Sequence, residues 1–77
     1  MNGEVNERIN DLLDKGASGA KRKAALKYLG EVLEEDYILN LPPQRPILKA
    51  LDTVSRRANI EPVVKSKAKK LIKEYGL

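Results

Sequence analysis

The sequence predicts an all-α domain of four short amphipathic helices, arranged as an antiparallel bundle or as a stacked array of helix pairs. Apolar residues recur at the three- and four-residue spacing of one helix face, and no segment alternates as a strand does. Glycine and proline divide the chain into four such segments joined by short connectors. We expect the 77 residues to form a single domain, residues 1–77.

The first helix is expected over residues 4–15. Val5, Ile9 and Leu12 fall at the spacing of one stripe along this helix. Gly16 follows as a C-terminal stop, because glycine readily adopts the left-handed conformation that ends many helices. The apolar stripe is the first contribution to the predicted interior.

The second helix is expected to start after Ser18, which can cap its N-terminus, and to run to about Glu35. Gly30 lies inside this helix and weakens it by up to ~1 kcal/mol relative to alanine. Its presence indicates a close crossing with another helix. The predicted inner face is Ala25, Leu26, Leu29, Val32 and Leu33.

Prolines mark the starts of the last two helices, because the missing N–H of proline has no helical partner in a first turn. The third helix therefore starts within residues 43–46, and Pro62 opens the fourth, which ends at Gly76. The predicted inner face of the third helix is Ile47, Ala50, Leu51, Val54 and Ala58. That of the fourth is Val63, Val64, Ala68, Leu71, Ile72 and Tyr75.

A weak internal repeat follows the same pattern twice. Leu29-x-x-Val32 and Leu51-x-x-Val54 are each followed six residues later by isoleucine and then by proline, which indicates either stacked repeats or two similar helix corners. The text Leu51-Asp52-x-Val54-Ser55, then Ile60-x-Pro62-x-Val64-Lys65-x-x-Ala68, resembles one helix pair of HEAT and armadillo repeats. Residues 26–75 resemble more particularly a family of small archaeal four-helix proteins of unassigned function. That resemblance implies stacked helix pairs and supplies no catalytic residue.

The composition argues against most catalytic chemistry. The chain contains no His and no Cys, the side chains that most often act as base, nucleophile or metal ligand at neutral pH. Paired carboxylates, a serine beside a base and a glycine-rich phosphate loop are also missing from the sequence. We therefore expect no enzyme activity, no catalytic or metal-binding residue, no cofactor and no small-molecule substrate.

The polar start and the lack of an apolar run of about 20 residues predict neither a signal peptide nor a membrane helix. Absence of cysteine fits a reducing compartment. The expected location is the cytoplasm, without a membrane partner.

Charge is unevenly divided between the two halves. Residues 1–40 carry six basic and eight acidic side chains, whereas residues 41–77 carry nine and three. The basic second half indicates DNA or RNA backbone as a partner, or alternatively a solubilising surface. Lysines at four-residue spacing on the fourth helix would make contacts that ignore nucleotide sequence. The candidate polyanion-binding residues are Lys65, Lys69, Lys70, Lys73, Arg56 and Arg57.

A second candidate is an anion seat at the start of the second helix. Helix N-termini present unpaired N–H groups, and Lys21, Arg22 and Lys23 add three cations there. These cations oppose the helix dipole, so a bound anion would explain their placement. The three residues are consecutive, however, and fan around the helix.

The connector after the second helix is more apolar than a connector needs to be. Tyr37, Ile38, Leu39 and Leu41 lie within five positions, and we expect some of them to form an exposed protein-contact patch. The sequence therefore predicts a non-catalytic helical binding module that contacts an unknown protein or forms a homodimer. The alternative is a weak, sequence-independent nucleic-acid binder that uses the basic face of the last helix.

Overall fold

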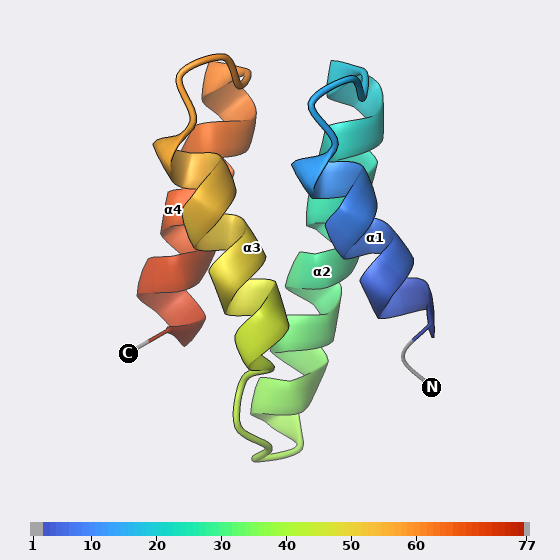
Figure 1. Cartoon of the computed structure of the whole chain (residues 1–77). Coiled ribbons are helices and arrows are strands. Elements are labelled where there is room, and N and C mark those ends of the chain that lie inside the picture. The colour runs from blue at the N-terminus through green and yellow to red at the C-terminus, as the bar shows by residue number, and fades with distance from the viewer. Residues whose placement is uncertain (1–2, 77) are drawn as a thin grey trace.

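Over residues 3–76, which the computed structural model describes, the chain folds into four helices in two layers (Figure 1). Helices α1 (Gly3–Leu13) and α3 (Arg45–Arg56) form one layer, and α2 (Gly19–Ile38) and α4 (Pro62–Tyr75) form the other. The packed pairs are α1–α2, α3–α4, α1–α3 and α2–α4. The Cα envelope is only 16 Å thick, as expected for two layers of helices. The all-α prediction is confirmed, and of the two predicted arrangements the structure has the stacked pair of helix hairpins.

One interior is shared by all four helices. Each helix and the α3–α4 connector contribute apolar side chains to it, and partly buried residues such as Tyr28 and Ile72 pack around its edge. Burial of these side chains from water is the main force that holds the layers together. The buried apolar residues are Val5, Leu12, Ala25, Leu26, Leu29, Leu33, Ile47, Ala50, Leu51, Val54, Ile60, Val64, Ala68 and Leu71.

Two residues predicted for the interior lie outside it. Ala58 is exposed because α3 ends at Arg56, which places Ala58 in the turn before α4. Val63 is 61% exposed, since its neighbour Val64 takes the inward position and successive helix positions differ by about 100°. The apolar pair at the start of α4 therefore supplies one core residue instead of two.

The first helix ends at Leu13, two residues before the predicted stop, and ends by a different device. The Asp14 side chain accepts a hydrogen bond from the Gly16 N–H (2.9 Å), and the Asp14 carbonyl accepts one from Ala17. No glycine within residues 3–76 has a positive φ, so Gly16 does not act as a left-handed cap. An aspartate that hydrogen-bonds two residues onward favours a turn over continued helix.

The second helix continues to Ile38, three residues beyond the predicted end. Asn40 adopts a left-handed conformation (φ 60°), which asparagine tolerates better than most residues. The Asn40 N–H bonds to the Tyr37 carbonyl, and the Leu41 N–H bonds to the Asp36 carbonyl (2.8 Å). This pair of bonds is the Schellman motif, in which a left-handed residue follows the helix cap. Asn40 therefore ends the helix, and the acidic residues before it do not.

The starts of α3 and α4 agree with the sequence analysis. Each helix has a proline in its first two positions, Pro46 and Pro62. Gly30 also fulfils its prediction, because it faces the Leu71 side chain of α4 where α2 and α4 cross. Within residues 3–76 no helix combines the length and the apolar character needed to cross a membrane.

Candidate functional site

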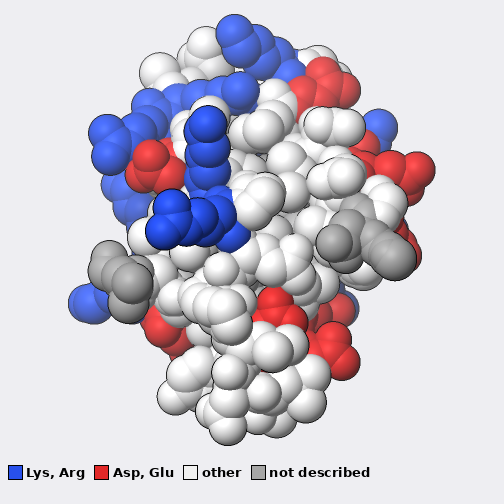
Figure 2. All heavy atoms as spheres, turned by 60° about the horizontal axis from the view of Figure 1, so that its bottom comes forward, with Lys and Arg blue, Asp and Glu red and all other residues white. Residues whose placement is uncertain are grey.

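Four exposed apolar side chains form what we call the apolar corner: Tyr37, Ile38, Leu39 and Leu41. It lies at the end of the molecule where α2 leads into α3. Tyr37 and Ile38 are 70% and 69% exposed, and Leu39 and Leu41 are each more than half exposed. Figure 2 looks toward this end and shows a broad area without charged side chains, with most charges near its margin. The exposure that the sequence analysis expected for these residues is therefore present.

The Schellman turn builds the apolar corner. It reverses the chain just after Ile38, so that the last turn of α2 and the residues beyond it face solvent together. A shallow groove runs between them, lined by Tyr37, Ile38, Asn40, Leu41 and Pro42.

Two members of the apolar corner also contact the rest of the fold. The Tyr37 ring packs edge-on against Tyr75 of α4, with ring centroids 5.9 Å apart at an angle of 68°. Leu41 lines a cleft that also contains Leu33 and Tyr75. Ile38 and Leu39 take no part in these contacts. They are therefore the residues whose replacement separates binding from folding.

The predicted polyanion-binding residues fall into two groups. Lys69, Lys70 and Lys73 are exposed on α4, and Lys65 is half-buried. No carboxylate within residues 3–76 forms an ion pair with these lysines.

The two arginines have partners of their own. Arg56 pairs with Asp52 on its own helix (Nε–Oδ1 3.0 Å). Arg57 extends toward α1 and donates from Nη1 to the Leu13 carbonyl (2.6 Å). The basic surface that remains unpaired is thus the lysine row of α4.

The predicted anion seat at the start of α2 is filled by a carboxylate of the chain itself. Arg22 is 5% exposed and donates from Nη1 to both carboxylate oxygens of Glu61, at 3.2 and 3.1 Å. Its Nη2 donates to the carbonyls of Asp14 and Lys15, both at 3.2 Å. Arg22 thereby joins the end of α1, the start of α2 and the residue before α4. An external anion cannot reach this guanidinium in the predicted way.

The other two cations of the predicted seat point elsewhere. Lys21 lies 3.6 Å from Asp11 of α1, and Lys23 is exposed. The three side chains therefore do not converge on one ligand, because consecutive helix positions face different directions. This correction removes Lys21, Arg22 and Lys23 as a joint binding site.

Glu61 also explains the reversed charge pattern of α2. The first turn of α2 contains no acidic residue of its own. A Cβ added to Gly19 in that turn would lie 3.0 Å from Oε2 of Glu61, so the carboxylate sits directly over the helix start. A negative charge there complements the helix dipole. A hydrogen bond from the backbone at Glu61 has the largest effect on the pKa of Glu61 and lowers it; desolvation opposes this, and the Arg22 charge lowers it further.

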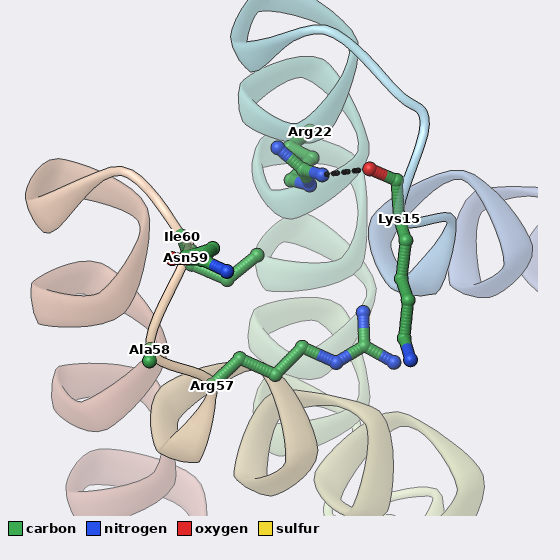
Figure 3. Close-up of a pocket in the computed structure, with 6 residues that line it drawn as sticks. All are labelled: Lys15, Arg22, Arg57, Ala58, Asn59 and Ile60. Atoms are coloured by element: carbon green, nitrogen blue, oxygen red, sulfur yellow. Dashed lines mark hydrogen bonds between the residues drawn. The ribbon is translucent and has the colours of Figure 1, made fainter.

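A basic cleft lies at the end of the molecule opposite the apolar corner, between the α1–α2 and α3–α4 connectors (Figure 3). Its volume is about 340 Å³. Three cations from three separate segments line it, and its other walls are an amide and two apolar side chains. The lining residues are Lys15, Arg22, Arg57, Ala58, Asn59 and Ile60. The sequence analysis did not predict this cleft, because its cations are far apart along the chain.

Comparison with known proteins adds no assignment. No protein-family model, curated protein or solved structure matches the chain. The resemblance to small archaeal four-helix proteins therefore stays a prediction. No group of three or more potential metal-ligating side chains occurs within the described residues 3–76.

Proposed function

We propose that the protein is a non-catalytic binding module whose apolar corner contacts another protein, in the first instance a second copy of itself. The observation that supports this is the exposure of Tyr37, Ile38, Leu39 and Leu41 at one end of the fold. Apolar patches bordered by polar residues are typical of protein-contact sites. Self-contact is favoured because such a patch complements its own copy across a two-fold axis.

The strength of this contact can be estimated from the exposed side chains. Full burial of an aliphatic side chain contributes about 1.5–3 kcal/mol, so the partly exposed Ile38, Leu39 and Leu41 would each contribute roughly 1–2 kcal/mol. Two copies together gain roughly 6–12 kcal/mol, against an association cost of about 4–15 kcal/mol. These terms nearly balance. We therefore expect a weak dimer that depends on protein concentration.

Sedimentation equilibrium over a range of protein concentrations tests this function. The wild-type chain should show a mass that rises from monomer toward dimer as concentration increases. Ile38→Glu and Leu39→Glu should remain monomeric, because each places a charge at the contact and would bury it unpaired. Val63→Glu is the matched control, since Val63 is exposed to a similar degree but lies outside the apolar corner.

Equal association of wild type and Ile38→Glu would contradict a role for the apolar corner. A wild-type monomer at every concentration would exclude the second copy as the occupant. In that case the same pair, Ile38→Glu and Val63→Glu, tests a different protein partner by cross-linking in cell extract. Loss of a cross-linked species in Ile38→Glu alone would then identify the apolar corner as the contact.

The second candidate function is sequence-independent nucleic-acid binding by the lysine row of α4. It is favoured by Lys69, Lys70 and Lys73, which are exposed and form no ion pair with carboxylates of residues 3–76. Like charges at four-residue spacing repel one another slightly, so helix stability alone does not favour this row.

Fluorescence anisotropy with generic DNA and RNA at several salt concentrations tests the second candidate. Binding should weaken steeply as salt rises, and Lys69→Gln/Lys73→Gln should reduce the slope of log affinity against log salt by about two contacts. Lys27→Gln on α2 is the control, because it removes a cation from another helix. Undetectable binding at low salt would exclude this function.

A further inference from the structure

We infer that the basic cleft binds a small phosphate monoester, with the phosphate group between Lys15 and Arg57. This site is independent of the proposed contact function, since it lies at the opposite end of the fold from the apolar corner. The lining residues come from the α1–α2 connector, the first turns of α2 and the α3–α4 connector.

The first argument is charge. Lys15, Arg22 and Arg57 line one cleft, and Glu61 pairs with only one of them, Arg22. Figure 3 shows the Lys15 and Arg57 side chains extending toward the same side of the cleft. No carboxylate of residues 3–76 forms an ion pair with either of these two. Cations that share one cleft repel each other, and an anion between them would remove that repulsion.

The second argument is hydrogen-bond geometry. Arg57 uses Nη1 for the Leu13 carbonyl, which fixes its guanidinium and leaves other N–H donors of the fork without a recorded protein partner within residues 3–76. The Lys15 ammonium and the Asn59 amide add donors from other directions. A phosphate group carries about −1.5 to −2 charge at neutral pH and three strong acceptor oxygens, which suits donors that converge from several sides.

The third argument is size and lining. The volume of about 340 Å³ lies in the lower range of small-molecule sites. Ala58 and Ile60 supply apolar walls that a bare phosphate ion would leave uncovered. An organic group attached to the phosphate would cover them. The cleft therefore fits a monoester better than inorganic phosphate.

Arg22 has a supporting role in this site. Its guanidinium is held by Glu61 and two carbonyls, so it forms a fixed part of the cleft wall. Its Nε is buried and has no hydrogen-bond partner within residues 3–76. A buried donor without a partner leaves the local positive charge incompletely balanced. Arg22 thus raises the potential of the cleft without needing to touch the ligand.

Isothermal titration calorimetry with inorganic phosphate and with phenyl phosphate, at low ionic strength, tests the inference. Both ligands should bind saturably, and phenyl phosphate should bind more tightly because its ring covers Ala58 and Ile60. Lys15→Gln should weaken binding about tenfold, which corresponds to ~1.4 kcal/mol. Lys15 is exposed and forms no hydrogen bond or ion pair with its side chain within residues 3–76, so this variant should fold normally.

Two further variants complete the test. Arg57→Lys keeps the charge and loses the fork, and should also weaken binding. Lys27→Gln removes one cation outside the cleft and should change the affinity less than about twofold, as screening reduces distant charges. Equal weakening in Lys15→Gln and Lys27→Gln, equal affinity for both ligands, or no saturable binding would each overturn the inference.

Discussion

Replacement of Gly30 by alanine should stabilise the protein, although Gly30 lies at a helix crossing. Gly30 is near the middle of α2, a helix of 20 residues, where glycine costs about 0.8–1.0 kcal/mol relative to alanine. The added Cβ would lie 3.4 and 3.5 Å from the two methyl carbons of Leu71. These are close but ordinary contact distances, and the methyl groups end a flexible side chain. We expect a gain of about 0.5–1 kcal/mol.

Urea unfolding and thermal unfolding, both followed by circular dichroism, measure this gain. For a domain of this size it corresponds to a rise in melting temperature of roughly 2–8 °C. Ala24→Gly is the matched control, because Ala24 is exposed on the same helix and its replacement should lose a similar amount. Gly30→Leu should instead destabilise by about 1–3 kcal/mol, because the larger side chain must displace Leu71. Loss of stability in Gly30→Ala would refute the reasoning, since the two helices would then lie closer than these distances allow.

Two further predictions concern the ion pair and the interior. Glu61→Gln should be less stable than the wild type at neutral pH, because the native state lowers the pKa of Glu61 and so favours its charged form. A lowered pKa stabilises above the unfolded value of about 4.3 and this contribution disappears as pH falls through the native value, so the difference in urea midpoint should shrink on acidification; a difference that is constant with pH would contradict it. Leu51→Ala should cost about 2–5 kcal/mol in urea unfolding, because Leu51 is fully buried within the shared interior, and a cost below about 1 kcal/mol would contradict that burial.

Periodicity and proline positions were sufficient to predict the helices. The spacing of apolar residues such as Leu29 and Leu51 identified the buried faces, since one helical stripe must leave water. Pro46 and Pro62 identified helix starts because their backbone chemistry is local. Local chemistry of this kind can be recognised without knowledge of the tertiary structure.

Helix ends were harder to predict, because several local signals compete there. Asp14 ends α1 through its side chain before Gly16 is reached. Asn40 ends α2 in the left-handed conformation, and its position two residues before Pro42 was the available signal. The glycine and the acidic cluster were the wrong indicators at these two ends.

The arrangement of charge could not be derived from the sequence. Glu61 and Arg22 are 39 residues apart, and their pairing depends on how the two hairpins stack. The lack of an acidic residue in the first turn of α2 was a sign that another segment supplies one. The basic cleft depends in the same way on Lys15 and Arg57, which only the tertiary fold brings together.

An NMR dilution series on the wild-type chain tests the central claim most directly. If the apolar corner is the contact surface, backbone amide signals of residues 37–41 should shift with protein concentration, and those of the basic cleft and of the α4 lysines should not. Concentration-dependent shifts confined to the cleft or to α4, with residues 37–41 unchanged, would contradict the account.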